Sequence, residues 1–79
     1  MSKNYNHMDK PSLDQLSSFL EMLEKQPDHF GIYNLRSDKT WEALVKITIK
    51  QYNYLLYLIF NKHYIKAKTI LDQIGIEHK

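Results

Sequence analysis

Apolar residues recur at spacings of three and four in the first part of the chain. The set is Leu13, Leu16, Phe19, Leu20 and Leu23, and this spacing places its members on one face of a helix. Ser12 and Gln15 have the separation of a capping box, in which each side chain bonds the free backbone N–H of the other residue. Pro27 should stop the helix, because the residue before a proline avoids the α conformation. The pattern predicts a helix over residues 12–26.

A second apolar pattern, with spacings that alternate between four and three, runs through the middle of the chain. Its members are Trp41, Val45, Thr48, Tyr52, Leu55 and Ile59. A period of 3.5 is typical of a helix with one packed side, so we predict one long helix over residues 38–61, capped by Ser37 or Asp38. Residues 45–50 also alternate between β-branched apolar and polar positions, as a strand would. Whether residues 44–50 are helix or strand therefore stays open, although the lack of Gly and Pro favours helix.

The last predicted helix spans residues 64–74. Its apolar residues Tyr64, Ala67, Leu71 and Ile74 lie at i, i+3, i+7 and i+10. Gly75 follows at the place where a helix commonly needs a left-handed residue. Residues 61–63 are expected to separate this helix from the one before it.

Residues 51–74 thus look like a helical hairpin, and the second helix resembles the second helix of a tetratricopeptide unit. In that unit a small residue, here Ala67, lets the paired helices approach closely. The glycine expected in the first helix is replaced by Leu55, and no second repeat is present. Because repeats of this kind need neighbours to stack on, we interpret the pattern as generic helical-hairpin packing.

These elements predict an all-α fold, either a small three-helix bundle or a helical hairpin plus one helix, with one long central helix. Two glycines and two prolines are too few for the turns of an all-β protein. One helical domain would cover residues 11–76, between a flexible lead at residues 1–10 and a tail at residues 77–79. A chain of 79 residues without cysteine has a thin core and no disulfides, so it needs good helix packing or oligomerisation.

The composition argues against several kinds of chemistry. Without cysteine there is no thiolate zinc site, and the four histidines are scattered, with none four residues from another. No Gly-x-Ser-x-Gly motif is present, and two glycines cannot form a phosphate-binding loop. We therefore expect no enzymatic activity, no cofactor and no metal. The longest apolar run, residues 55–60, falls far short of the roughly 20 residues that span a bilayer, so we expect a cytoplasmic protein.

Between residues 54 and 60 the predicted long helix is apolar on every side. One helix and a connector cannot easily cover such a helix, so part of it should face a partner protein or a second copy. The alternative is that two helices cover opposite sides while the tyrosines keep only their hydroxyls in water. In the apolar connector, residues 27–37, Phe30 and Tyr33 either plug the open end of the helices or act as exposed anchors.

The sequence accordingly predicts a non-enzymatic protein-interaction module, with a homodimer through the middle helix as one form. The expected contact residues are Phe30, Tyr33, Tyr54, Tyr57, Leu58 and Phe60. The small size of the chain and its frequent use of Lys, Asn, Ile and Tyr are associated with small bacterial or phage regulators, inhibitors or immunity proteins.

Basic residues supply an alternative function. Residues 1–28 hold three Lys and five Asp or Glu, for −2, whereas residues 29–79 hold eight Lys or Arg and four Asp or Glu, for +4. Lysines suit phosphate contacts, but the single arginine leaves little for reading bases. The alternative is a small nucleic-acid-binding regulator that contacts phosphates through Lys46, Lys50, Lys62, Lys66 and Lys68.

Overall fold

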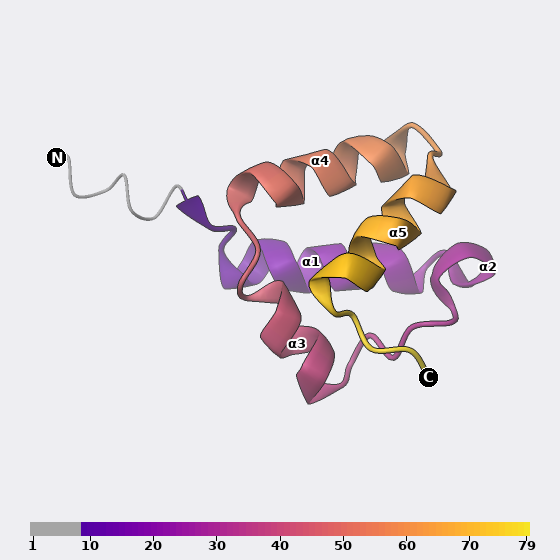
Figure 1. The fold of residues 1–79 in the computed structure, drawn as a ribbon, viewed down its shortest axis with the longest axis horizontal. Coiled ribbons are helices and arrows are strands. Elements are labelled where there is room, and N and C mark those ends of the chain that lie inside the picture. Colours follow the sequence, from indigo (N-terminus) through magenta and orange to yellow (C-terminus); the bar gives the residue numbers. More distant parts are fainter. Residues whose placement is uncertain (1–8) are drawn as a thin grey trace, which may run out of the picture.

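A computed structural model describes residues 9–79 (Figure 1). It contains five helices: α1 (Leu13–Glu24), α2 (Pro27–Phe30), α3 (Asp38–Leu44), α4 (Ile49–Phe60) and α5 (Tyr64–Ile74). In Figure 1, α1 runs through the middle of the molecule, with α4 above it, α3 below it and α5 crossing it. The predicted all-α fold class is confirmed for this part of the chain. Most of the predicted lead, residues 1–8, lies outside the described residues.

The first helix begins where the capping box predicts. The Ser12 hydroxyl accepts a hydrogen bond from the Gln15 amide at 3.1 Å, and the Gln15 side chain accepts one from the Ser12 amide at 2.8 Å. The helix buries Leu16, Phe19, Leu20 and Leu23. It ends at Glu24, and Pro27 then opens the one-turn helix α2. Proline suits a first helical position because the amide it lacks would have no partner there.

The prediction of one helix over residues 38–61 is wrong. Residues 45–48 separate α3 from α4 and form neither helix nor strand. The cause is a second capping box: the Thr48 hydroxyl accepts from the Gln51 amide at 3.1 Å, and the Gln51 side chain accepts from the Thr48 amide at 2.9 Å. Thr48 is extended, with φ −84° and ψ 163°, so the backbone changes direction there and α4 starts anew.

The break divides the predicted apolar pattern. Tyr52, Leu55 and Ile59 in α4 are buried, whereas Trp41 and Val45 are half-buried and Thr48 is exposed. Near the break, the core is instead filled by Leu44 and Ile47, which are 0% and 2% exposed. Both helices can therefore direct apolar side chains to a common core from different sides (Figure 1).

The helical hairpin predicted over residues 51–74 is confirmed, since α4 and α5 pack against each other. The turn between them includes Lys62 in the left-handed region, with φ 61°. The His63 amide donates to the Leu58 carbonyl at 2.7 Å. Gly75 ends α5 with φ 99°, as predicted, because glycine adopts this conformation without strain.

Residues 76–79 pack along the connector that precedes α3. The Asn34 amide donates to the Glu77 carbonyl at 2.7 Å, and the Lys79 amide donates to the Ile32 carbonyl at 2.8 Å. The buried Thr40 hydroxyl donates to the Asn34 carbonyl and accepts from the Glu77 amide. Residues 77–79, predicted to be a tail, are thus held against the rest of the domain.

We expect Thr48→Ala to lower the free energy of unfolding by about 1 kcal/mol, since it removes the cap that starts α4. Urea titration followed by circular dichroism measures this change. Thr69→Ala is the matched control, because its hydroxyl bonds the Ile65 carbonyl one turn back in α5 and its loss should change stability by less than about 0.5 kcal/mol. Equal effects of the two substitutions would show that the capping box does not define the break.

Candidate functional site

The six predicted contact residues separate into two groups. Tyr54, Tyr57 and Phe60 are 42%, 57% and 70% exposed on α4. Phe30, Tyr33 and Leu58 are buried, so they are not available to a partner in this conformation. Of the two interpretations of the connector, the one in which its aromatic residues fill the core is the one that the structure shows.

The direction of Leu58 follows from helix geometry. Each residue is turned by about 100° from the one before it, so Leu58 faces inward although its neighbour Tyr57 faces out. The same geometry puts Tyr54, Tyr57 and Phe60, three residues apart, on the outward side of α4. Residue type alone does not distinguish the two directions in a helix made almost entirely of apolar residues.

The exposed apolar residues are unevenly distributed. Of the six large hydrophobic side chains that are exposed in residues 9–79, Tyr54, Tyr57, Phe60 and Ile65 belong to the α4–α5 hairpin, and only Leu13 and Ile32 lie elsewhere. Ile65 is 83% exposed, more than any of the others. Ile65 was not among the predicted contact residues, because the period that defines the buried side of α5 does not include it.

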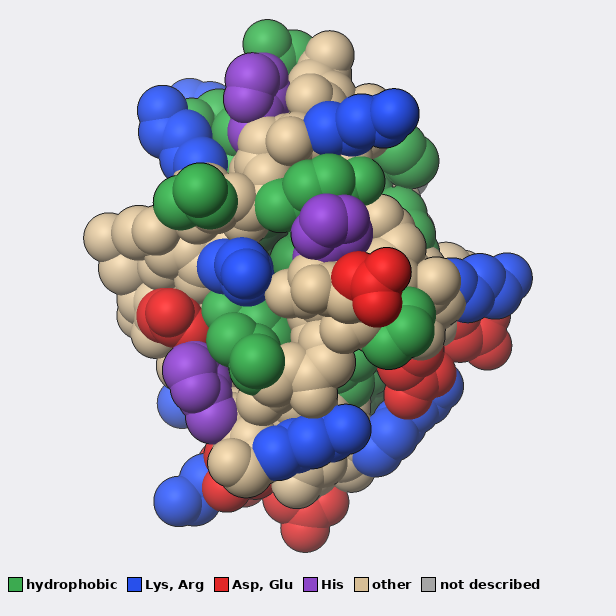
Figure 2. Space-filling view, turned by 90° about the vertical axis from the view of Figure 1, so that its right-hand side faces the viewer, with side chains coloured by type: hydrophobic (Ala, Val, Ile, Leu, Met, Phe, Trp, Pro, Cys, Tyr) green, Lys and Arg blue, Asp and Glu red, His purple; other side chains and the backbone are tan. Residues whose placement is uncertain are grey.

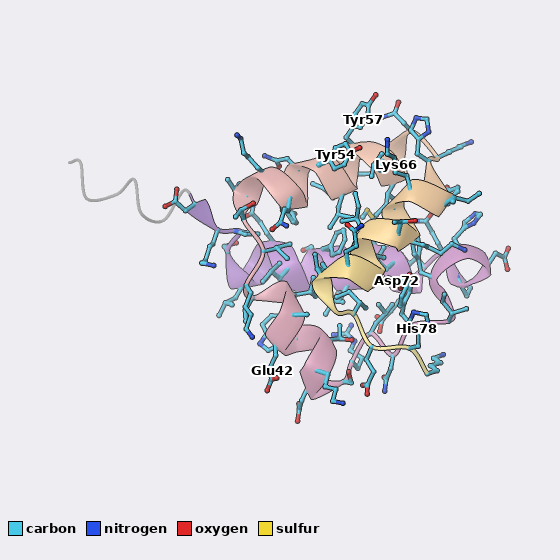
Figure 3. All side chains as sticks on the ribbon, viewed as in Figure 1. Glu42, Tyr54, Tyr57, Lys66, Asp72 and His78 are labelled. Carbon is cyan, nitrogen blue, oxygen red and sulfur yellow. The ribbon has the colours of Figure 1, made fainter. Side chains whose placement is uncertain are left out.

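Aromatic rings connect α4 to the turn that follows it. The Tyr54 and Tyr57 rings are nearly parallel, at 12°, with centroids 6.5 Å apart. The Tyr57 and His63 rings lie 6.3 Å apart at 30°. In Figure 3, Tyr54, Tyr57 and Lys66 gather over the upper part of the hairpin. The exposed rings of α4 therefore continue onto the start of α5 rather than forming isolated spots.

An open groove lies at this end of the hairpin. Its lining is His29, Lys62, His63, Tyr64, Ile65, Lys66, Lys68 and Thr69. The rings of His29 and Tyr64 stack with centroids 3.6 Å apart at 9°, which fixes α2 against α5. We call Lys62, Lys66 and Lys68 the groove lysines, and we call Tyr54, Tyr57, Phe60, His63, Ile65 and the groove lysines together the hairpin surface.

The charge around the groove is positive. Residues 43–71 contain five lysines and no Asp or Glu. Figure 2 shows basic and histidine side chains beside hydrophobic ones in the upper part of the view, while acidic side chains lie from mid-height downwards, one of them directly beside a histidine. Of the five lysines predicted to contact phosphates, three line the groove. Lys50 lies in the first turn of α4 and Lys46 in the break before it, at the other end of a helix of 12 residues, which is about 18 Å long.

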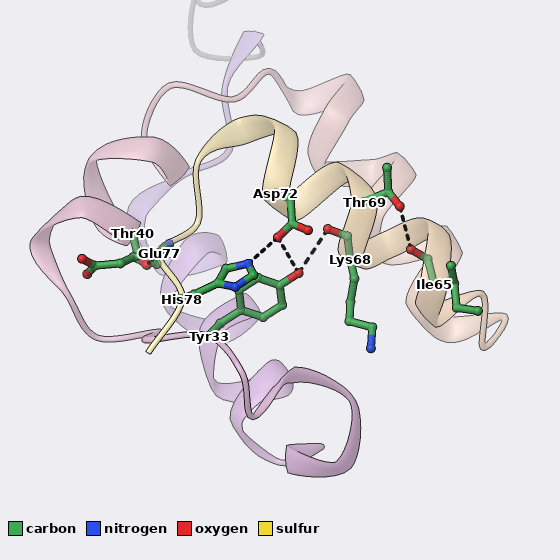
Figure 4. Close-up of polar contacts among 8 residues, drawn as sticks. All are labelled: Tyr33, Thr40, Ile65, Lys68, Thr69, Asp72, Glu77 and His78. Atoms are coloured by element: carbon green, nitrogen blue, oxygen red, sulfur yellow. Dashed lines mark hydrogen bonds and ion pairs between the residues drawn. The ribbon is translucent and has the colours of Figure 1, made fainter.

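A polar cluster that the sequence did not indicate joins α5 to Tyr33 of the connector and to His78 of the C-terminal residues (Figure 4). The Tyr33 hydroxyl lies 2.9 Å from Asp72 Oδ1 and 3.1 Å from the Lys68 carbonyl oxygen. His78 Nε2 lies 2.8 Å from the same Asp72 oxygen. The members are 6 and 39 residues from Asp72, a separation that no local pattern reveals.

The pKa shifts within this cluster stabilise the contact between its members. The hydrogen bond from His78 is the main cause that lowers the pKa of Asp72, and the bond from Tyr33 adds to it. Burial, followed by the bond to Asp72, raises the pKa of the Tyr33 hydroxyl. A raised pKa makes that hydroxyl a poorer nucleophile, and its proton is already engaged. The cluster therefore holds His78 and the C-terminal residues in place.

Other site types find little support in residues 9–79. No three His, Asp or Glu side chains lie together as metal ligands would, and no helix has the length and hydrophobicity to cross a membrane. A cleft of about 280 Å³ beside α2 has Glu24 and Arg36 at its edge, but these two bond each other through two contacts of 2.8 Å. No protein-family model, curated protein or solved structure shows significant similarity to the chain.

We expect Leu58→Ala to lower the free energy of unfolding by about 2–5 kcal/mol, because it leaves a cavity in the core. Tyr57→Ala, one position earlier, should change it by less than about 1 kcal/mol, since the ring is exposed. Urea titration of both variants measures the difference. Similar losses in the two variants would mean that Tyr57 is part of the core.

We expect Asp72→Asn to reduce the loss of stability in acid. The folded-state pKa of Asp72 lies below its ordinary value, so its contribution is full above about pH 4 and disappears as the pH falls through the folded-state pKa. The carboxylate is half-exposed, so the effect should be under about 1 kcal/mol. Urea midpoints at neutral and acidic pH measure it. Glu42→Gln is the control, because the structure gives Glu42 no ion pair within residues 9–79; the idea fails if both variants lose stability in acid as the parent does.

Proposed function

We propose that this chain is a non-enzymatic protein-interaction module that contacts a partner protein through the hairpin surface. The observation that supports this most directly is the gathering of four of the six exposed large hydrophobic side chains on one hairpin. Contiguous exposed apolar side chains bordered by polar ones are typical of interaction sites, whereas single exposed ones are ordinary. Tyrosine is also among the residues enriched where binding energy concentrates.

The fold does not need these side chains for its own stability. The core already contains 16 buried hydrophobic residues, and within residues 9–79 no buried side-chain nitrogen or oxygen lacks a hydrogen-bond partner. A serine at position 57 or 65 would leave the core unchanged and make the surface more soluble. Exposed aromatic and aliphatic groups at these positions are therefore better explained by contact with another molecule.

A different protein fits this surface better than a second copy placed face to face. Such a dimer has two-fold symmetry, so each patch meets the same patch on the other chain. Here that would place the groove lysines of both copies in one interface without any acidic residue of the hairpin surface to pair with them, and like charges in one interface are unfavourable. The proposal is accordingly a small regulator or inhibitor that acts by covering a site on its partner. A chain without cysteine suits the reducing cytoplasm, where we propose that it acts.

Nucleic acid is the second candidate, favoured by the three lysines in one groove and by the absence of acidic residues from positions 43–71. Such binding would depend on phosphate contacts and would weaken steeply with salt. The only arginine, Arg36, is bonded to Glu24, so the side chain best suited to reading guanine is engaged elsewhere.

We expect Tyr57→Ser/Ile65→Ser to lose the proteins that the immobilised parent chain retains from cells of its source, because it removes exposed apolar contacts. The matched control is Leu13→Ser/Ile32→Ser, which replaces the two exposed hydrophobic residues outside the hairpin. Mass spectrometry identifies what each variant retains, and circular dichroism confirms that both are folded. Equal retention by the two variants would reject the hairpin surface as the contact site.

A further inference from the structure

The hairpin surface contains three lysines and no acidic residue. No acidic residue lies between Glu42 and Asp72, and the groove lysines take part in no salt bridge in residues 9–79. Asp72 is the acidic residue nearest to them in sequence; its carboxylate is hydrogen-bonded to His78 and Tyr33, and the charge of Lys68 also helps to lower its pKa. Lys62 and Lys66 have no such acidic neighbour in sequence. Charges that are not neutralised internally attract an anionic partner and exclude a cationic one.

The groove is apolar as well as positive. Ile65, the most exposed hydrophobic residue of the domain, lies in its lining together with the groove lysines. Tyr57 reaches the same end through its contact with His63. Ile65, unlike the rings of Tyr57 and His63 nearby, has no flat face on which a nucleic-acid base could stack, whereas it packs well against leucine or valine. The surface therefore suits a ligand that carries both carboxylates and apolar side chains.

The polar groups of the groove suit carboxylates better than bases. The Thr69 hydroxyl is bonded to the Ile65 carbonyl, and the groove lining contains no Arg, Asn or Gln. Besides the rings of His29, His63 and Tyr64, the lining offers flexible ammonium groups, which attract anions as point charges without a fixed orientation. Lys62, in the turn before α5, and Lys66, in its first turn, both line the groove, so a partner can meet each of them with a separate carboxylate.

We propose that the hairpin surface binds an acidic amphipathic helix of a partner protein. The carboxylates of that helix face the groove lysines, and its apolar side chains cover Ile65 and Tyr57. This inference rests on the proposed function and adds to it the chemistry of the partner. It also explains why the surface combines lysines with large apolar groups, a combination that neither a purely acidic segment nor a purely apolar one would match.

A designed peptide tests the proposal with the full chain. The probe is a fluorescent helical peptide of about 16 residues, long enough for four turns, with glutamates four apart on one side and leucines beside them. A second peptide has glutamine in place of each glutamate. Fluorescence anisotropy should show the glutamate peptide binding at least about tenfold more tightly at low salt. The preference should shrink as salt is raised, because salt screens exposed charges.

Substitutions in the chain locate the effect. Replacing the three groove lysines by glutamine should weaken binding of the glutamate peptide by about tenfold. The matched control is Lys25→Gln/Lys39→Gln/Lys79→Gln, which removes the same charge outside the groove and should change affinity by less than about twofold. Circular dichroism establishes that both variants are folded. Equal weakening by the two triple variants would overturn the proposal, because the attraction would then come from net charge alone.

The remaining outcomes separate the two levels of the proposal. Equal affinity for the two peptides, lost in Tyr57→Ser/Ile65→Ser, would overturn the acidic partner and leave the protein-interaction surface standing. Tighter binding of an oligothymidylate than of the glutamate peptide, lost with the groove lysines, would overturn both in favour of nucleic acid. Concentration-dependent self-association that is lost with the groove lysines would identify a second copy, and overturn a separate acidic partner. If the glutamate peptide does not bind at a peptide concentration of about 1 mM, the proposal of an acidic partner helix is also overturned.

Discussion

Four side chains on one face of α1, each at most 3% exposed, must be covered by the other helices of a 79-residue chain. Phe19 meets Tyr52 of α4 edge to face, with ring centroids 5.9 Å apart, and α2 packs back against α1. An unbroken helix over residues 38–61 would be about 36 Å long and could lie against α1 on one side only. The break at residues 45–48 lets α3 and α4 approach the core separately.

The same arrangement produces the exposed surface. Once α1 and α5 cover the inner side of α4, the rings of Tyr54, Tyr57 and Phe60 have no remaining part of the chain to pack against. The α4–α5 hairpin therefore has two functions on opposite sides: its buried side completes the core, and its outer side presents aromatic and basic groups. Because the sides are separate, substitutions on the outer side test the proposed binding while the buried side is left intact.

Local backbone signals made much of the fold predictable from the sequence. The capping box at Ser12, the cap at Ser37 and the glycine after α5 each act within a few residues. The capping box at Thr48 and Gln51 is the same kind of signal, but the break that it ends is four residues long, close to one helical turn. The apolar spacing therefore keeps its phase across the break and suggests continuity. The pairing of Asp72 with Tyr33 and His78, and the inward direction of Leu58, depend on tertiary packing that no local pattern contains.

Lys62 belongs both to the turn that joins α4 to α5 and to the lining of the groove. It has a left-handed backbone conformation, with φ 61°, which costs a residue with a side chain about 1 kcal/mol compared with glycine. A glycine or asparagine at this position would turn the chain more easily. The lysine instead lines the groove together with Lys66. The turn that closes the hairpin therefore also supplies part of the proposed binding surface, and a ligand that contacts Lys62 would contact the point where α4 and α5 are joined.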